Sequence, residues 1–526
     1  MEKIVKEFMQ KGYLIDQLLV KIVDTPEINT ILPFFTEAVI SNQPAKIISK
    51  DFFMTHLDNI VNQLKSRSKV MDEKGGFLKA IDYLKQFSKT EPSLELKKTE
   101  KKKEETESEK TQFKDLRVLD SFCIENRKVS VEDFVKYFRD RFNTIKNFLI
   151  EHNLRNLTSI NKISGQRQNV TVLGLVYYRR YTKNKNLLLE VEDLTGRIRI
   201  IIRKEKEELF EKAKEIVLDE VLAFNCSGSN EILFANDIIF PEAILKERKK
   251  CEKEIYAIFT ADLHVGSNKF LEKNFLKFIE WVNGKIGSEK QKEIAKKVKY
   301  LFIAGDLVDG VGIYPGQRSE LAIDDIYKQY DKAAELLAKI RKDIIIVICP
   351  GNHDAVRIVE PQPAFNEEIA KKLYEMKNVV VLTNPCFVNM ASSKNFPGFN
   401  VFMYHGASFD FYANDLDILR TSKPYRRPEI VINLLLRKRH VAPTHTSTRY
   451  FPCERDSLVL RKVPDVFVLA HIHKSSVSRY NNILVISCSS WQPQTPYQEK
   501  FGHEPDPCKV PIFNLKTGKV NIIDFS

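Results

Sequence analysis

The sequence has few cysteines and no two of them close together. Its eight cysteines are spread over 526 residues, and none forms a C-x-x-C motif. Disulfide frameworks and structural zinc sites need such clusters, so neither is expected to organise this chain. We expect most of these thiols to be buried.

Long apolar runs are missing as well. No stretch reaches about 18 uninterrupted apolar residues, the length that a membrane helix requires. The start, "MEKIVKEFMQKGYLIDQLLV", carries charges throughout and lacks the apolar core and cleavage site of a secretion signal. With 43% hydrophobic and 29% charged residues, the composition is that of a folded soluble protein. Together, these features lead us to expect an intracellular protein.

The net charge is +13 and the isoelectric point is near 9.1. A basic balance is compatible with a polyanionic partner such as nucleic acid. Surfaces rich in lysine and glutamate are also typical of thermophilic proteins. Charge alone therefore leaves nucleic-acid binding open.

The first part of the chain predicts a helical module followed by a linker. Apolar residues recur every three or four positions over residues 1–87, which indicates helices. Residues 88–114 contain almost no apolar side chains, and the stretch from Lys97 to Lys110 holds six lysines and five glutamates. Such a segment cannot bury enough surface to offset its ordering entropy, so we expect a disordered linker, with a solvated single helix as the alternative.

Residues 115–250 predict a helical lead-in and a small β-barrel. After "VEDFVKYFRDRFNTIKNFLIEH", the pattern gives three β-rich runs, the helical "EKEELFEKAKEIV" and two more strands. That order matches the five-stranded OB-fold, which often binds single-stranded nucleic acid through aromatic and basic side chains. Docking of a protein is the alternative use of this surface. The candidate nucleic-acid contacts are Tyr177, Tyr178, Arg179, Arg180 and Tyr181.

Residues 251–526 predict a layered α/β domain, because apolar strand candidates alternate with helices. Several of these strands end in His, Asp or Asn, and half of the ten histidines lie in these motifs. Alternate residues of an extended segment point the same way, so D-x-H and H-x-H each offer two side chains to one place. The motif residues are Asp262, His264, Asp306, Asn352, His353, Asp354, His405, His471 and His473.

A single histidine of this kind is usually an ordinary core or loop residue, but five such motifs on successive strands favour a common site. Sites in α/β sheets lie outside the carboxyl ends of the strands. Imidazoles suit Mn, Fe or Zn, and a carboxylate can bridge two ions. Two neighbouring ions can acidify a water molecule and stabilise displacement at phosphorus. We therefore expect two divalent metal ions, Mn first and Fe or Zn as alternatives.

The series "DLH", "GDLVDG", "GNHD", "YHG" and "AHIH" resembles the calcineurin-like metallophosphoesterases. The wider segments "YPGQRSELAIDDIYKQYDKAAELL", "PGNHDAVRIVEPQPAF", "YHGASFD", "RKRHVAP" and "SSWQPQTPYQ" are similar to the small subunit of archaeal family D DNA polymerase. The resemblance covers residues 115–526. One departure is Ala470, where the superfamily motif usually has glycine; a positive φ at that position would strain an alanine.

The resemblance implies a role for each motif residue. Asp306 would bridge two ions, and His353 would face the phosphate with Asp354 orienting it. One ion would be bound by Asp262, His264, Asp306 and His473, and the other by Asp306, Asn352, His405 and His471.

The same resemblance implies a 3′–5′ proofreading exonuclease subunit of a two-subunit archaeal replicative polymerase, located in the cytoplasm with the nucleoid. Its partners would be the large catalytic subunit, DNA with a single-stranded or mismatched 3′ primer end, and the sliding clamp through the holoenzyme. No clamp-binding motif is recognised in the sequence. Two alternatives stay open: a non-catalytic scaffold subunit, which should have lost metal ligands, and a free-standing metallophosphatase, against which the OB-fold argues.

Overall fold

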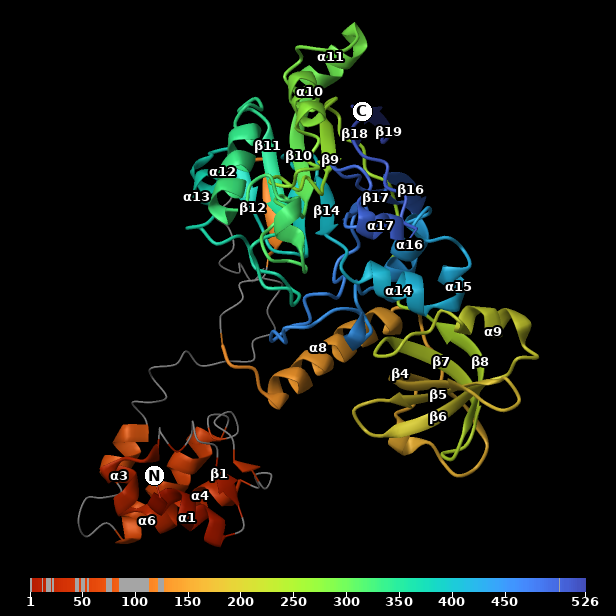
Figure 1. The fold of residues 1–526 in the computed structure, drawn as a ribbon. Helices are drawn as coiled ribbons and strands as arrows, with labels where there is room; N and C mark the ends of the chain where they lie inside the picture. Colours follow the sequence, from red (N-terminus) through yellow and green to blue (C-terminus); the bar gives the residue numbers. More distant parts are fainter. Residues whose placement is uncertain are drawn as a thin grey trace. The chain divides into compact units, whose positions relative to one another are not determined.

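The computed structural model describes residues 2–11, 13–15, 20, 23–42, 47–48, 53, 56–71, 78–84, 113–121, 127–500 and 502–526. It falls into two compact units, Met1–Glu104 and Glu105–Ser526 (Figure 1). None of the described helices is long and apolar enough to cross a membrane.

The first unit is a small helical module, as predicted. A shared core of apolar side chains, including Phe8, Phe35 and Ile60, holds it together. A short parallel pair of strands lies in segments expected to be helical, and residues 78–84 are helical. Of the linker predicted over residues 88–114, residues 88–112 lie outside the described part of the chain. The elements are α1 Glu2–Gln10, β1 Leu14–Ile15, α3 Pro26–Thr30, α4 Leu32–Ile40, β2 Ile47–Ile48 and α6 Leu57–Met71.

The second unit contains the predicted five-stranded barrel, which is closed in the order β4-β5-β6-β8-β7. Strand β4 pairs with β7 through its first half and with β5 through its second half. Gly174 lies where the pairing changes, and a Cβ there would come within 2.3 Å of the Val191 side chain. The elements are β4 Gln168–Tyr181, β5 Leu187–Glu192, β6 Arg197–Ile202, α9 Glu207–Ala213, β7 Val221–Gly228 and β8 Leu233–Ile239.

The remaining strands form two six-stranded sheets (Figure 1). The first has the order β12-β11-β10-β9-β18-β19, and the second has the order β16-β17-β15-β14-β13-β3. The strands of the first sheet are β9 Tyr256–Thr260, β10 Val298–Ala304, β11 Ile345–Cys349, β12 Val379–Val381, β18 Lys509–Asn514 and β19 Val520–Asp524. Those of the second are β3 Leu116–Asp120, β13 Cys386–Met390, β14 Phe399–Tyr404, β15 Val466–Leu469, β16 Ser476–Tyr480 and β17 Ile483–Ser487.

The central strands are buried on both faces, because the two sheets pack against each other and helices cover their outer faces. On β10, Leu301 and Ile303 pack against the helices of one face, whereas Tyr300 and Phe302 pack against the other sheet. Successive side chains of a strand point to opposite faces, so a continuous apolar run is what such a strand needs. The helices on the first sheet are α10 Glu272–Val282, α11 Glu289–Lys296, α12 Ile326–Leu337 and α13 Lys371–Glu375. The second sheet is covered by α14 Phe409–Asp415, α15 Asp417–Arg420 and α16 Glu429–Lys438. The last helix of the chain is α17 Pro496–Lys500.

Residues 115–250 do not all belong with the barrel. Strand β3, expected in the lead-in, pairs antiparallel with β13 and completes the edge of the second sheet. The predicted lead-in helix is α8 Val131–Ile150, which starts with a capping box between Ser130 and Asp133. Its buried side packs against the barrel strands β4 and β7.

Buried ion pairs join α8 and the barrel to the domain that contains the two six-stranded sheets. Arg141 of α8 is fully buried, with Nε 2.6 Å from Asp456 Oδ2, and it donates to the carbonyl of Pro443 at 2.5 Å. Lys438 at the end of α16 lies 2.8 Å from Glu220 of the barrel. Loss of one partner would leave an uncompensated buried charge, so these pairs fix the barrel firmly on the domain.

Candidate metal centre

The candidate site lies where the parallel strands of both sheets end. The motif residues follow β9, β10 and β11 of one sheet and β14 and β15 of the other. Six of them form three overlapping groups whose ligand atoms lie within 4.8 Å of one another. These groups are Asp262 with His264 and His473, His264 with Asp306 and His353, and Asp262 with Asp306 and His405.

One half of the site is built from two imidazoles and a carboxylate. The Nε2 atoms of His264 and His473 are 3.2 Å apart, close to the separation of two nitrogens that share an ion at about 2.1 Å each. Asp306 Oδ2 lies 3.8 Å from His264 Nε2. Asp262 completes a group with His264 and His473, and such a group could hold a single divalent cation.

The other half is centred on His405. Its Nδ1 lies 3.0 Å from the carbonyl of Ala304, which can only accept, so Nδ1 carries the proton and Nε2 faces the site. That Nε2 is 2.9 Å from Asn352 Oδ1 and 3.4 Å from Asp306 Oδ2. The ring of His471 lies beside it, with 5.2 Å between centroids. Asp306 Oδ2 thus faces histidines of both halves, as a bridging ligand would.

Asp262 shows that the site suits cations. Its carboxylate is fully buried, Oδ2 accepts from the backbone N–H of His471 at 3.1 Å, and Oδ1 has no hydrogen-bond partner among the described residues. Oδ1 lies 3.9 Å from His473 Nε2 and 4.0 Å from His405 Nδ1. Burial raises the pKa of Asp262 to about 7, with His405 opposing the rise and Asp306 adding to it. A bound cation would satisfy this oxygen and favour the charged carboxylate.

The backbone is strained at the same residues. Five of the candidate ligands have φ between 46° and 72°, a left-handed conformation that costs a non-glycine residue about 1–3 kcal/mol. Strain of this kind persists only where the surrounding structure enforces it, and it clusters at functional sites. The five residues are Asp262, His264, Asp306, His471 and His473.

Two glycines allow the close packing of these side chains. A Cβ at Gly305 would lie 2.2 Å from His405 Nδ1, and one at Gly351 would lie 2.2 Å from Asp306 Oδ1. Ala470, by contrast, is not among the described residues with positive φ. The alanine in place of the usual glycine therefore adds no left-handed strain to the last motif.

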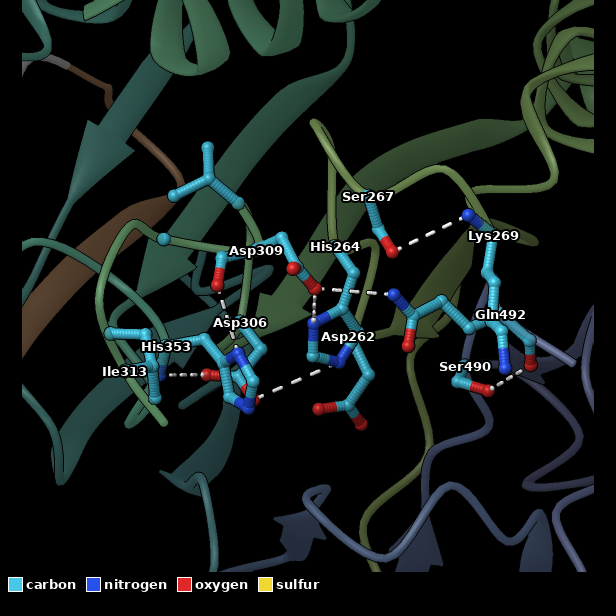
Figure 2. A network of polar contacts seen from close by, with 12 residues as sticks. Asp262, His264, Ser267, Lys269, Asp306, Asp309, Ile313, His353, Ser490 and Gln492 are labelled. Carbon is cyan, nitrogen blue, oxygen red and sulfur yellow. Dashed lines mark hydrogen bonds and ion pairs between the residues drawn. The ribbon is translucent and has the colours of Figure 1, made fainter. Parts of the chain in front are cut away.

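The ring of His353 is held by Asp309, a residue that sequence reasoning did not select. His353 Nδ1 donates to the backbone carbonyl of Asp309 at 2.9 Å, and the carboxylate of Asp309 lies 3.1 Å from His264 Nδ1. Figure 2 shows Asp309 between the two histidines. The backbone N–H of His353 also donates to Asp306 Oδ1 at 2.8 Å. One residue thus fixes the ring nitrogens of two site histidines.

The prediction that Asp354 orients His353 is corrected by the structure. The buried Asp354 carboxylate accepts backbone N–H groups of Gly351, Leu307 and Val308 at 2.8–3.2 Å, and Tyr330 donates to it at 3.3 Å. These bonds join the loop after β11 to the loop after β10. Asp354 therefore joins the loop that carries Asp306 to the loop that carries Asn352, and it does not hold the imidazole of His353.

Comparison with known proteins agrees with this geometry. Residues 256–475 match the family model described as calcineurin-like phosphoesterase. The DNA polymerase II small subunit of Methanothermobacter thermautotrophicus is 38% identical over 398 residues, which cover 75% of this chain and 80% of the relative. That of Archaeoglobus fulgidus is 34% identical over 495 residues, covering 90% and 97%. The chain belongs to the family of DNA polymerase II small subunits. A further relative, from Pyrococcus furiosus, is 37% identical over 407 residues, which cover 76% of this chain but 64% of the relative.

Further polar residues of this small subunit support the site without having been predicted. His471 Nε2 lies 3.2 Å from Asp410 Oδ2 of α14, and His473 Nδ1 lies 2.9 Å from Gln498 Nε2 of α17. Gln492 donates to Asp309 at 3.2 Å. Asp309 could have been found as the last acid of "GDLVDG". The other three lie in the quoted segments "YHGASFD" and "SSWQPQTPYQ", but their resemblance gave these residues no role.

A cavity of ≈ 550 Å³ opens over the centre. Its walls include His264, His353 and His473 together with Lys269 and Tyr314. The aromatic and basic residues predicted to bind nucleic acid lie elsewhere, on strand β4 of the barrel. They are not among the described residues that line this cavity.

Proposed function

We propose that this small subunit is the 3′–5′ proofreading exonuclease of a two-subunit archaeal replicative DNA polymerase, acting through a dinuclear metal site. The observation that carries the proposal is Oδ1 of the buried Asp262, which has no hydrogen-bond partner among the described residues and lies 3.9 Å from His473 Nε2. A buried carboxylate oxygen is costly unless a cation or donor satisfies it. A subunit that served only as a scaffold would be more stable without it.

The donor set fits divalent ions of intermediate softness. Carboxylate and imidazole ligands together favour Mn, with Fe or Zn as alternatives. Two such ions would neutralise the phosphate and lower the pKa of a water molecule near phosphorus. The proposed ligands are Asp262, His264, Asp306 and His473 for one ion, and Asp306, Asn352, His405 and His471 for the other.

His353 is the proposed proton donor. Its Nδ1 is bonded to the carbonyl of Asp309, so Nε2 is the nitrogen left to act on the substrate. Burial lowers the pKa of His353, and the neighbouring Asp306 carboxylate opposes this effect. The negative charge of a bound phosphodiester would favour protonation, after which Nε2 can donate to the leaving 3′ oxygen.

The names of the relatives as small subunits support a large polymerase subunit and DNA as partners. We propose the 3′ end of a primer, single-stranded or mismatched, as the substrate. The barrel surface around Tyr178 and Arg180 is proposed as a secondary contact to the single strand. Hydrolysis of the last phosphodiester at the metal centre would release a nucleoside 5′-monophosphate and leave a 3′-hydroxyl on the shortened primer.

The test uses the purified chain with Mn²⁺ and a labelled mismatched primer. Wild type should release nucleoside monophosphates, and His353→Ala should be slower by roughly 10²–10⁴-fold at unchanged metal content. His152→Ala, which alters an exposed histidine, is the matched control. Undiminished activity in His353→Ala would contradict the assigned role. Hydrolysis of p-nitrophenyl phosphate but not of the primer would indicate a phosphatase, and metal binding without either activity would indicate a scaffold.

A further inference from the structure

The loop after β10 exposes apolar side chains at the mouth of the candidate active site. Val311, Ile313 and Tyr314 are 43%, 39% and 39% exposed, and the latter two line the cavity over the metal centre. Apolar side chains are stabilised when a ligand covers them. Exposure beside the metal centre therefore suggests a contact with substrate.

This loop is held in a defined position. The buried Gln317 donates to the backbone carbonyl of Asp309 at 2.9 Å and to its carboxylate at 3.1 Å. The same side chain accepts the backbone N–H of Ile313 at 2.9 Å. The hydroxyl of Tyr314 donates to Glu320 at 3.1 Å. The tyrosine ring is thus fixed relative to Asp309, which orients His264 and His353.

The ring of Tyr314 lies next to the residue that is proposed to act on the phosphate. Its centroid is 6.3 Å from that of His353, and the two planes are inclined at 67°. Figure 2 shows Ile313 on the same side of the site as His353. A nucleobase is joined to its 5′-phosphate through a single sugar, so a base attached to a phosphate in the centre can reach this ring.

Charge in the cavity also fits a nucleotide. Lys269 lines the same cavity, and within the described part of the chain no carboxylate lies at ion-pair distance from its ammonium group. An aromatic ring combined with a free cation is the arrangement by which proteins hold the base and the backbone of a single strand.

Resting on the exonuclease function proposed above, we propose that Tyr314 and Ile313 form a subsite on which the base of the 3′-terminal nucleotide stacks. Every base has a π-face, so the subsite does not select sequence. It selects an end whose base is free, because a paired base is already stacked within the duplex. The subsite thereby accounts for preference toward single-stranded and mismatched primer ends.

The experiment varies the base and the tyrosine independently. Two single-stranded oligonucleotides are compared, one with a normal 3′-terminal nucleotide and one with an abasic tetrahydrofuran residue there. The variants are Tyr314→Ala and Tyr314→Phe, with Tyr327→Ala as a control that removes an exposed tyrosine of α12.

Wild type, Tyr314→Phe and Tyr327→Ala should all prefer the base-bearing end. Tyr314→Ala should lose roughly 5- to 150-fold in kcat/KM on that end, mainly through KM, and little on the abasic end. Equal effects of Tyr314→Ala on both substrates, or no effect on either, would overturn the proposal.

A binding measurement separates this proposal from the exonuclease function. Calorimetry with Mn²⁺ present compares dAMP with deoxyribose 5-phosphate on the full chain. Wild type should bind dAMP more tightly than deoxyribose 5-phosphate, and Tyr314→Ala should lose this difference. That result supports the subsite even if the chain releases no nucleotide. In that case only the proposed exonuclease function fails. Equal affinity of both ligands for wild type would overturn the subsite.

Discussion

The Asp309 carboxylate lies 3.1 Å from Nδ1 of His264. Since a carboxylate accepts, this contact places the proton on Nδ1 and leaves Nε2 toward Asp306 and His473. Partners of this kind orient a metal-binding imidazole and raise its basicity. Asp309 is therefore as much a part of the site as the predicted ligands.

The first prediction concerns that contact. Asp309→Asn keeps the size of the side chain but removes its charge, so Mn²⁺ affinity should fall by about 10- to 100-fold. Calorimetric titration of the purified chain measures the change. Asp324→Asn, at an exposed acid paired with Arg318, should bind Mn²⁺ as wild type does. Unchanged affinity in Asp309→Asn would contradict the orienting role.

The second prediction concerns His440, a buried histidine at the junction of α8 and the phosphoesterase domain. Its Nε2 donates to Asp456 at 2.9 Å and its Nδ1 accepts the backbone N–H of Ala442 at 2.9 Å, so the neutral ring is fully satisfied. Burial, aided by Arg141 and opposed by Asp456, lowers the pKa of His440 to about 4. Between its ordinary pKa near 6.5 and about 4, the unfolded chain takes up a proton that the folded chain refuses.

Stability should consequently fall as the pH drops through this window, by roughly 3 kcal/mol from this residue. Urea unfolding at several pH values between about 7 and 4 measures it. His440→Gln keeps a donor toward Asp456 and should show a shallower decline, although it is less stable at neutral pH. The exposed His152→Gln should decline as wild type does. Parallel curves for wild type and His440→Gln would refute the assignment.

The third prediction concerns the barrel surface. Tyr178 and Arg180 are two positions apart on β4, so they share a face. Tyr177 is the extra residue of a bulge in the pairing of β4 with β5, and the guanidinium of Arg197 covers its ring at 3.6 Å. Tyr178→Ala should therefore weaken single-strand binding by about 1–3 kcal/mol, and Tyr177→Ala by less.

Arg180→Ala should weaken binding and make it less dependent on salt. Fluorescence anisotropy with a labelled oligonucleotide at two salt concentrations measures both effects. Unchanged binding in Tyr178→Ala and Arg180→Ala would assign this face to a protein partner instead.

The elements with a strong local signal could be predicted from the sequence. The apolar runs that precede the five motifs are all strands, namely β9, β10, β11, β14 and β15. Their His, Asp and Asn residues meet because parallel strands end at one edge. The order of strands and helix along the barrel sequence could be predicted from the alternation of apolar and polar residues and from the turn residues. The assignment of all of residues 115–250 to the barrel and its lead-in failed because it depends on long-range pairing. Strand β3 pairs with β13, which lies more than half of the chain away.

Adjacency in sequence misled the assignment of partners. Asp354 follows His353 directly, yet its carboxylate turns to backbone N–H groups of two loops, while Asp309 from the preceding strand end holds the ring. Which acid meets an imidazole depends on loop geometry that periodicity does not encode. The position of Tyr314 over the cavity depends in the same way on the hydrogen bonds of Gln317.

The most direct test of the account is the metal content of the purified chain together with its nuclease activity, for wild type and Asp306→Asn. Asp306 is the ligand that both ions would share, with Oδ2 3.4 Å from His405 and 3.8 Å from His264. We predict that wild type binds two Mn²⁺ ions and shortens a mismatched primer, and that Asp306→Asn loses both properties while remaining folded. A wild-type chain that binds no metal, or an Asp306→Asn variant that cleaves the primer normally, would contradict the account.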